Sequence, residues 1–454
     1  MNRKTWLTLL GTASIAVFAG FYAVKQAVTA SVSEYFYAYP IVLMDQTYDV
    51  MTTDMKLMDS ALENRFVHTK QFPDPSFTVV VKPNNDTLYS SGWYDVSEEP
   101  VVLSVPDMGD RYFMFPIMDM WTEIFTSIGS RTTGQEQSDF LLVAKGWQGY
   151  VPEGLTVIEA PTTKGWIIGR TLAEGEKDYP EVSALQEQYL LRKLSDWQTG
   201  SEAMSGITRV ACEVCSTPPP VTVANMDAAT FYDRFAELLA QYPGHAEDAA
   251  ILDDMSANGL TQVGGFDRLP FYKKWLVELG VTAAKKILQD PPLPNPVEGW
   301  SVSIDDIGSY NQNYAKRAVI AKIGLGANEA IDATYPMTAV DVNNELFDGS
   351  KSYILHFDAD EIPPVNGFWS LTMYNDDGYF IENTIDRYSI GSRNNLIFNQ
   401  DGSLDILIQH KAPADNTANW LPAPAEGFNV AMRLYWPKDS VLNGDWYPPA
   451  ITPQ

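Results

Sequence analysis

The sequence has few basic residues for its length, and this shortage excludes one class of partner. Its 454 residues include 31 Lys and Arg against 58 Asp and Glu, a formal net charge of -27 at pH 7. Nucleic-acid backbones are anionic and are bound through clustered Lys and Arg. The pairs Lys273-Lys274 and Lys285-Lys286 are isolated and flanked by apolar residues. The composition therefore predicts no nucleic-acid partner.

Cysteine is almost absent, because Cys212 and Cys215 are the only two. In an oxidising compartment such a close pair is expected to form one local disulfide. A redox-active pair is the alternative, but such pairs usually open a helix. The following run 217–220, Thr-Pro-Pro-Pro, is not expected to begin one in that way. No second Cys or His pair stands nearby, so zinc is not expected.

Several catalytic motifs are missing as well. The sequence has no Gly-x-Ser-x-Gly elbow, no Walker loop, no dinucleotide fingerprint and no His-Glu-x-x-His helix. Its four histidines are scattered along the chain: His68, His245, His356 and His410. ATP-dependent, NAD-dependent and serine-hydrolase functions therefore lose support, and we assign no cofactor and no metal site.

Only one apolar run is long enough to matter for a membrane, and it lies at residues 6–24. It follows Arg3 and Lys4 and precedes the small residues 28–30, the layout of a secretory signal. As a helix its nineteen residues would extend roughly 28 Å, close to the thickness of a bilayer core. Residues 1–30 are therefore expected to be either a cleaved signal peptide or an N-terminal anchor. Both outcomes place the body on the far side of the cytoplasmic membrane. If the segment is cleaved, the body is periplasmic or extracellular. If it is retained, residues 6–24 anchor the body to the cytoplasmic membrane and are its one expected contact with it.

The body alternates between helical and strand-like patterns. Helices are expected over 34–58, 182–197, 227–241 (capped by Asp227), 271–288 and 305–332. Short apolar runs broken by Pro, Gly or Asp suggest strands between 76 and 170, among them 77–81, 101–103 and 112–115. Further strands are expected over 353–358, 368–374, 404–409 and 428–435, with Asp-Gly turns at 348–349, 377–378 and 401–402. The Pro-rich run 291–296 is typical of a linker. The pattern predicts an α+β protein in which a mainly helical segment joins two β units.

Two sets of motifs resemble known families. Residues 82–91 (Lys-Pro-Asn-Asn-Asp-Thr-Leu-Tyr-Ser-Ser) and 93–95 (Trp-Tyr-Asp) resemble the domain-of-unknown-function family numbered 1254, as do 111–113, 119–121 and 129–134. Residues 368–374 (Phe-Trp-Ser-Leu-Thr-Met-Tyr), 419–424 and 433–437 are similar to the family numbered 1214.

This resemblance implies a paired architecture whose C-terminal unit is similar to jelly-roll domains, which often bind carbohydrate. The expected fold is therefore two β-sandwich-like or jelly-roll-like units. The expected domains are an N-terminal β-rich domain over 35–175, a helical connecting segment over 176–296 and a C-terminal domain over 297–450. The resemblance implies no reaction, because neither family has an established common activity and fold alone does not fix function.

The densest polar cluster follows the strand-like run 77–81. It consists of Asn84, Asn85, Asp86 and Tyr89, with Trp93 close behind. One interpretation is a turn in which Asn and Asp bond their own backbone. The other is the rim of a site, where Asp86 supplies a catalytic carboxylate and the amides orient a ligand.

A second candidate is Asp119, which with Trp121 lies in the apolar run 116–121. A buried carboxylate needs a partner, and Arg111 or Arg131 is expected to supply it. Asp119 is then either a structural ion pair or, beside Asp86, the second carboxylate of an acid/base pair of the kind that cleaves glycosides. In that second case Trp121 and Arg131 would help to bind the ligand.

A third cluster lies in the C-terminal half, where Tyr374, Asn375 and Arg387 surround a turn and Trp420 offers a flat ring. It is either an ordered hairpin or a ligand-facing patch with an aromatic platform. Three hypotheses therefore stay open: a cofactor-independent enzyme on a small molecule or glycan, a carbohydrate- or small-ligand-binding module, and a structural envelope protein.

Overall fold

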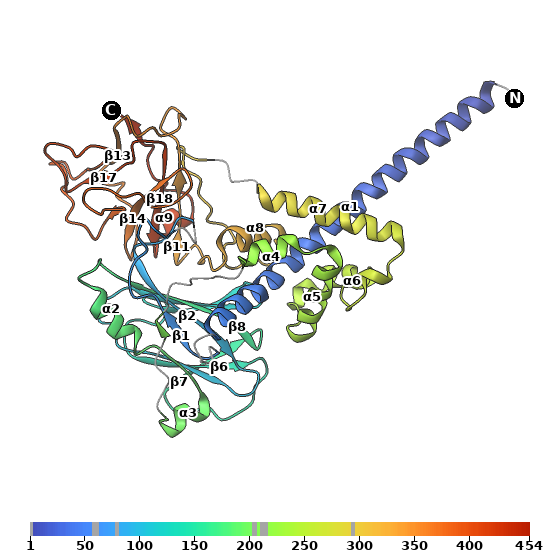
Figure 1. Ribbon diagram of the computed structural model, residues 1–454, viewed down its shortest axis with the longest axis horizontal. Coiled ribbons are helices and arrows are strands. Elements are labelled where there is room, and N and C mark those ends of the chain that lie inside the picture. The colour runs from blue at the N-terminus through green and yellow to red at the C-terminus, as the bar shows by residue number, and fades with distance from the viewer. Residues whose placement is uncertain (1–2, 57–62, 78–80, 202–206, 209–216, 292–295) are drawn as a thin grey trace.

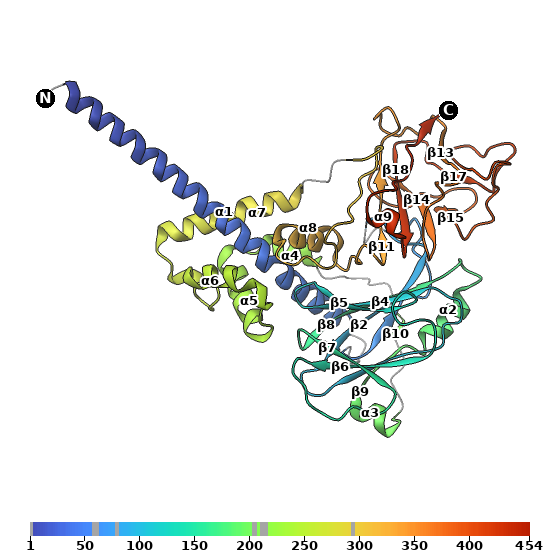
Figure 2. The same cartoon turned by 180° about the vertical axis from the view of Figure 1, so that it is seen from behind.

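A computed structural model describes residues 3–56, 63–77, 81–201, 207–208, 217–291 and 296–454, with no description of the side chains of 3–19, 53–56 and 207–208. Figures 1 and 2 show two strand-rich units and a helical body beside them. The long helix α1 (Arg3–Lys56) runs through the helical body, and its N-terminal end projects away from the rest. The α+β class with a helical segment between two strand-rich regions is confirmed, whereas the jelly-roll arrangement stays a prediction.

The N-terminal unit is built from two sheets. The first has the order β10-β1-β2-β8-β4-β5, and the second has the order β7-β6-β3-β9. The strands of the first are β10 (Ile207–Thr208), β1 (Phe66–His68), β2 (Thr87–Asp95), β8 (Lys164–Leu172), β4 (Phe113–Asp119) and β5 (Ile124–Gly129). Those of the second are β7 (Leu155–Ala160), β6 (Ser138–Ala144), β3 (Val101–Val105) and β9 (Leu190–Lys193). Apolar residues of both sheets share one core, and β3 and β4 are buried along their whole length.

The helix expected over 182–197 is wrong in its middle. The structure has α2 (Tyr179–Gln186), then β9, then α3 (Leu194–Thr199). Residues 190–193 pair with β3 instead of continuing a helix, and Leu191 enters the core between the sheets. Tertiary packing has overridden the local helical spacing here.

The C-terminal unit also has two sheets around one core. The first contains β11 (Ala333–Thr334), β18 (Phe428–Tyr435), β14 (Trp369–Asn375) and β15 (Ser389–Gly391), with β12 (Met337–Thr338) paired to β18. The second contains β17 (Trp420–Pro422), β16 (Leu404–Gln409), β13 (Tyr353–Phe357) and β19 (Thr452–Pro453), and the short helix α9 (Asp439–Leu442) follows β18. All four strands expected in this half are confirmed. β16 alternates buried and partly exposed residues, as a strand with one core face does.

The helical body surrounds α1 with α4 (Pro219–Asn225), α5 (Ala228–Gln241), α6 (Ala249–Ala257), α7 (Phe271–Gln289) and α8 (Tyr314–Gly324), and the short turns Ala246–Asp248 and Phe266–Arg268 join them. Asp227 caps α5 by accepting a hydrogen bond from the Thr230 N–H, as expected. The expectation that the proline run would not open a helix is wrong, because α4 begins at Pro219. Proline is tolerated in the first turn, where its missing N–H has no intrahelical partner. The helix expected over 305–332 is confirmed only as α8.

Helix α1 supplies the centre of this body. Residues 35–44 of α1 are buried on all sides among α4, α5, α7 and α8. In the opposite direction α1 becomes exposed from Ala30 back to Gly20, and residues 28–30 lie inside the continuous helix. No helix of the described residues has both the length and the apolarity to cross a membrane. The side chains of residues 6–19 in the apolar segment are not described, and Cys212, Cys215 and parts of the runs 77–81 and 291–296 lie outside the described residues.

Helix α7 packs tightly against α1 at Gly280, and this contact gives the first prediction. A Cβ added at Gly280 would lie 2.3 Å from the Ser31 Cβ and 2.9 Å from its backbone carbonyl carbon. We expect Gly280→Ala to lower the free energy of unfolding by about 1–3 kcal/mol, the usual effect of overpacking, when measured by urea titration. Gly324→Ala is the matched control, because nothing lies within 4 Å of its added Cβ. If the two variants were equally stable, α1 and α7 would not pack as described.

Candidate functional site

The two strand-rich units meet at the loop that precedes β2. The Lys82 N–H donates a hydrogen bond to the Gly378 carbonyl at 2.7 Å. The Pro83 carbonyl accepts one from the Tyr374 hydroxyl, also at 2.7 Å. The structure therefore brings together two of the predicted clusters, the one around Asn84 and the one around Tyr374.

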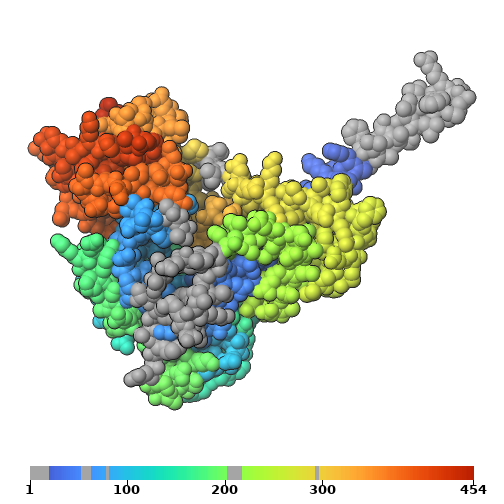
Figure 3. All heavy atoms as spheres, viewed as in Figure 1, coloured from blue at the N-terminus to red at the C-terminus, as the bar shows by residue number. Residues whose placement is uncertain are grey.

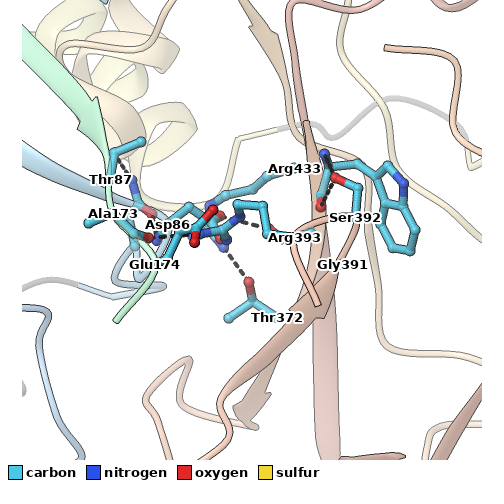
Figure 4. Close-up of polar contacts among 12 residues, drawn as sticks. Asp86, Thr87, Ala173, Glu174, Thr372, Gly391, Ser392, Arg393 and Arg433 are labelled. Carbon is cyan, nitrogen blue, oxygen red and sulfur yellow. Dashed lines mark hydrogen bonds and ion pairs between the residues drawn. The ribbon is translucent and has the colours of Figure 1, made fainter. Parts of the chain in front are cut away.

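Asp86 lies at the centre of this contact and is 0% exposed. One carboxylate oxygen accepts a hydrogen bond from the Ser370 hydroxyl at 2.7 Å, and the other is paired with the Arg393 guanidinium. Figure 4 shows Arg393 reaching across the interface toward Asp86. Because both oxygens are engaged and no solvent reaches them, this geometry suits a residue that joins the two units rather than one that meets a substrate.

Three further cations gather beside this pair, and in the described part of the chain none of them has a carboxylate partner. Arg433 is buried and donates to the Thr372 and Tyr374 hydroxyls, each at 2.7 Å. Arg170 is buried, donates to two backbone carbonyls at 2.9 and 3.3 Å, and is also hydrogen-bonded to the Tyr89 hydroxyl. The Lys82 ammonium contacts the Met337 sulfur at 3.1 Å, and burial together with the charge of Arg433 lowers its pKa.

Polar side chains that solvent still reaches lie next to these cations. Tyr89 and Tyr335 are partly exposed, and Arg170 lies over the Tyr89 ring, 5.2 Å from its centroid. The Asn84 amide donates to the Tyr89 hydroxyl at 3.2 Å. Burial alone would raise the pKa of Tyr89, but the charge of Arg170 and the bond from Asn84 outweigh it, and the pKa lies below its usual value. We refer to Lys82, Arg170 and Arg433 with Asn84, Tyr89 and Tyr335 as the cationic cluster.

Asp119 has a different partner from the one expected. One oxygen accepts the backbone N–H groups of Trp121 and Glu123 at 2.9 and 3.0 Å, and the other lies 2.8 Å from the His245 ring. Arginine pairing at Asp119 was a wrong expectation. Arg111 pairs with Asp178 and Arg131 with Asp332, each at 2.6 Å. His245 comes from the loop after α5, 126 residues along the chain, and no local pattern links the two.

The two predicted catalytic carboxylates do not share a site. The residue next to Asp86, Thr87, pairs with Leu172 at one end of β8, whereas Asp119 pairs with Gly165 at the other. Seven residues of strand separate these register positions, which is roughly 23 Å at about 3.3 Å per residue. A two-carboxylate mechanism that uses both acids has no geometric basis.

Most of the remaining predicted residues serve the fold. Trp93 stacks on Trp166, Trp121 and Trp420 are buried, and Arg131 forms the ion pair given above. Arg387 donates to three backbone carbonyls between residues 417 and 420, and Asn375 accepts the Tyr379 N–H in a turn. The side-chain amide oxygen of Asn85 is buried without a hydrogen-bond partner among the described residues.

Sequence reasoning missed Arg170, Arg433, Lys82 and Tyr335 as site residues. A signal was present for Arg170, which follows an apolar stretch in β8 (Trp166–Gly169), where a charge is costly to bury. No sequence signal identified Tyr335, because its position beside Arg170 depends on how the two units dock.

Asp86→Asn tests the joining role. Removing the charge leaves Arg393 unpaired at the interface, so we expect the free energy of unfolding to fall by about 3 kcal/mol. Asp360→Asn, on an exposed loop, is the control and should change stability by less than about 0.5 kcal/mol. Adding Arg393→Met to Asp86→Asn should recover part of the loss, and strict additivity of the two substitutions would contradict a direct pair.

His245 gives a pH prediction. Burial opposes its protonation, but the hydrogen bond and charge of Asp119, with the charge of Asp248, outweigh burial and the nearby Arg317 and raise its pKa. Because the pKa of His245 is higher in the folded than in the unfolded protein, protonated His245 contributes its full stabilisation below the unfolded pKa of about 6.5. This contribution is lost as the pH rises through the folded pKa. The difference in unfolding free energy between the parent and His245→Gln should therefore be largest below pH 6.5 and shrink above it. A constant difference from acid to alkaline pH would contradict a charged His245–Asp119 pair.

Comparison with known proteins agrees with these motifs. The family of proteins of unknown function DUF1254 matches residues 63–193, and the family DUF1214, also of unknown function, matches residues 332–439. A comparison with curated proteins gave no match.

Among solved structures, the VPA0106 protein from Vibrio parahaemolyticus is similar over 94% of this chain and 100% of its own, with a TM-score of 0.71 and 24% identity. An uncharacterised protein from Burkholderia cenocepacia covers 96% of this chain and 95% of its own at 12% identity, but its TM-score of 0.40 is too low to support an argument. At such identities the first likeness bears on the fold alone. The chain therefore carries a DUF1254 match in its N-terminal part and a DUF1214 match in its C-terminal part.

Proposed function

We propose that the protein binds a small anionic ligand at the cationic cluster. The observation that carries the proposal is the presence of three cations, Lys82, Arg170 and Arg433, without a carboxylate partner in the described part of a chain whose net charge is -27. Asp86, a carboxylate whose charge acts on Arg433, is already paired with Arg393.

The electrostatic argument is simple. An unpaired charge is costly to hold away from water, and a bound anion would offset that cost. Arginine presents several N–H donors in a planar fork that fits carboxylates and phosphates, and a lysine ammonium has three donors. The Lys82 ammonium contacts the thioether sulfur of Met337, which is a weak acceptor. Of the three cations, Lys82 would therefore be stabilised most by a bound anion.

Other members of the cluster would set the orientation of the ligand. Asn84 and the hydroxyls of Tyr89 and Tyr335 offer neutral hydrogen bonds, and the tyrosine rings offer apolar faces. A carboxylate or phosphate attached to a ring or sugar fits this combination. The alternative of neutral-carbohydrate binding on a tryptophan platform is weakened, because Trp93, Trp121 and Trp420 are buried.

A second candidate function is proton transfer to or from the bound ligand by Tyr89. The bond from Asn84 and the position of Arg170 over its ring both favour the phenolate, which makes this hydroxyl a better acid than an ordinary tyrosine. This proposal replaces the carboxylate mechanism, since Asp86 has both oxygens engaged. Binding without turnover and binding with turnover are separated by Tyr89→Phe, which keeps the ring and removes the proton.

Matched ligand pairs test the binding proposal. Glucuronate and glucose differ in a carboxylate, as do benzoate and benzamide. We expect at least one of the two anions to raise the melting temperature in a concentration-dependent way and its neutral partner to have no such effect, because only a ligand of the folded state stabilises it.

The variant Lys82→Gln should need a ligand concentration about tenfold or more higher to reach the same rise in melting temperature, as expected for loss of one charge-assisted hydrogen bond. Lys193→Gln removes the same charge from an exposed lysine paired with Glu98 and should leave the response unchanged. Equal responses to the anion and its neutral partner in both pairs would overturn the proposal.

A further inference from the structure

A second feature, far from the cationic cluster, lies at the start of α7. The side chains of Phe271, Tyr272 and Trp275 are 86%, 52% and 51% exposed. Positions 271 and 275 are four residues apart and therefore lie on one side of the helix, with 272 beside them. Leu279 continues the same side one turn later and is also exposed. Three large aromatic side chains grouped on one solvent-facing surface are typical of an interaction site.

The opposite side of α7 fixes where this surface lies. Val277, Gly280, Val281 and Ala284 are buried, and Gly280 packs against Ser31 of α1. Ser31 is the point at which α1 changes from buried to exposed, and from there α1 projects away from the body. Figure 3 shows α7 beside the first side chains of α1 that the structure describes. The aromatic surface therefore lies next to the place where α1 leaves the protein.

The same part of α1 is apolar and exposed. Phe21 and Tyr22 are exposed large side chains, and the sequence from 6 to 24 is mostly apolar and contains no charged residue. The aromatic surface of α7 and the projecting part of α1 are thus two neighbouring surfaces of similar chemistry.

Charge separates the possible partners of these surfaces. Helix α7 contains four lysines and one glutamate, a local net charge of 4 − 1 = +3, in a chain of net charge -27. Helix α7 is therefore basic and aromatic on a strongly acidic protein, although Lys274 is also paired with Asp267 at 3.4 Å. Anionic lipid headgroups attract lysines, and Trp and Tyr prefer the boundary between headgroups and acyl chains. A second copy of this chain would bring two bodies of net charge -27 together, which their mutual repulsion opposes.

We propose that the aromatic surface of α7, formed by Phe271, Tyr272 and Trp275, rests on an anionic lipid bilayer beside the point where the apolar segment of α1 enters it. Lys274 and Lys286, which flank the aromatic side of the helix, then lie near the headgroups, and the aromatic rings lie at the boundary below them. This contact orients the body with respect to the membrane, which a single projecting helix would leave free to swing.

Site-directed fluorescence in vesicles tests this orientation. The full chain, with Cys212 and Cys215 replaced by Ser, carries a dye on a cysteine introduced as Tyr272→Cys, Phe21→Cys or Leu346→Cys. Leu346 is 74% exposed in the C-terminal unit and is the matched control. Each protein is reconstituted into vesicles of phosphatidylcholine with phosphatidylglycerol, some of whose lipids carry a nitroxide quencher near the headgroup.

We expect quenching at 272 and 21 and none at 346. Replacing phosphatidylglycerol by phosphatidylcholine, or Lys274 and Lys286 by Gln, should reduce quenching at 272 more than at 21. Quenching at 21 alone would show an inserted α1 with a free α7 and would overturn the proposal, as would an absence of quenching at both. Quenching at 272 that disappears on dilution to one protein per vesicle would identify a second copy as the partner instead.

Discussion

The arrangement of this protein depends on one buried carboxylate. Asp86 joins residues that are far apart in sequence, because Ser370 and Arg393, which it binds, lie in the other strand-rich unit. A carboxylate removed from water requires partners of this kind, so the two units cannot separate without exposing or orphaning it. The aromatic contact of Tyr112 with Phe368 and Tyr435 adds apolar surface to the same interface. The interface that creates the candidate site is therefore fixed by charge and aromatic packing together.

The same interface explains why the cationic cluster exists. Docking places Arg433 of the C-terminal unit next to Lys82 and Arg170 of the N-terminal unit, and neither unit alone contains all three. Asp86 forms its ion pair with Arg393 and also acts on Arg433 through its charge, but one carboxylate cannot balance all of these cations. Tyr89 responds to this charge through its lowered pKa. A site of this type could not be assembled in either family region by itself, which gives a physical reason for pairing them in one chain.

The strands and helices were predicted from the sequence more accurately than the candidate site was. Alternating or continuous apolar runs identified β14, β16 and β18, because the residues of a strand that face a core are apolar and form a pattern visible in the sequence. It failed for β9, whose residues have helical spacing but are held by pairing with β3. The polar cluster from Asn84 to Tyr89 was also identified, since polar residues at the start of a strand stand out. The partner of Asp119 was not, because His245 reaches it only through the packing of α5 against α1 and the N-terminal sheet.

Strand β8 separates the protein into two chemical regions. At its Leu172 end lies the interface with Asp86, and at its Gly165 end lie Asp119 and His245, next to the buried part of α1. A small ligand cannot touch both ends of a strand of this length, so the two regions serve different purposes. Tyr37 of α1 packs against Trp121, which ties the helix to the second region. Burial of α1 begins at Ser31, directly after the residues that resemble a cleavage site. Cutting or keeping the segment before Ser31 would therefore leave the same core intact, and the aromatic surface of α7 would be available to a membrane in either case.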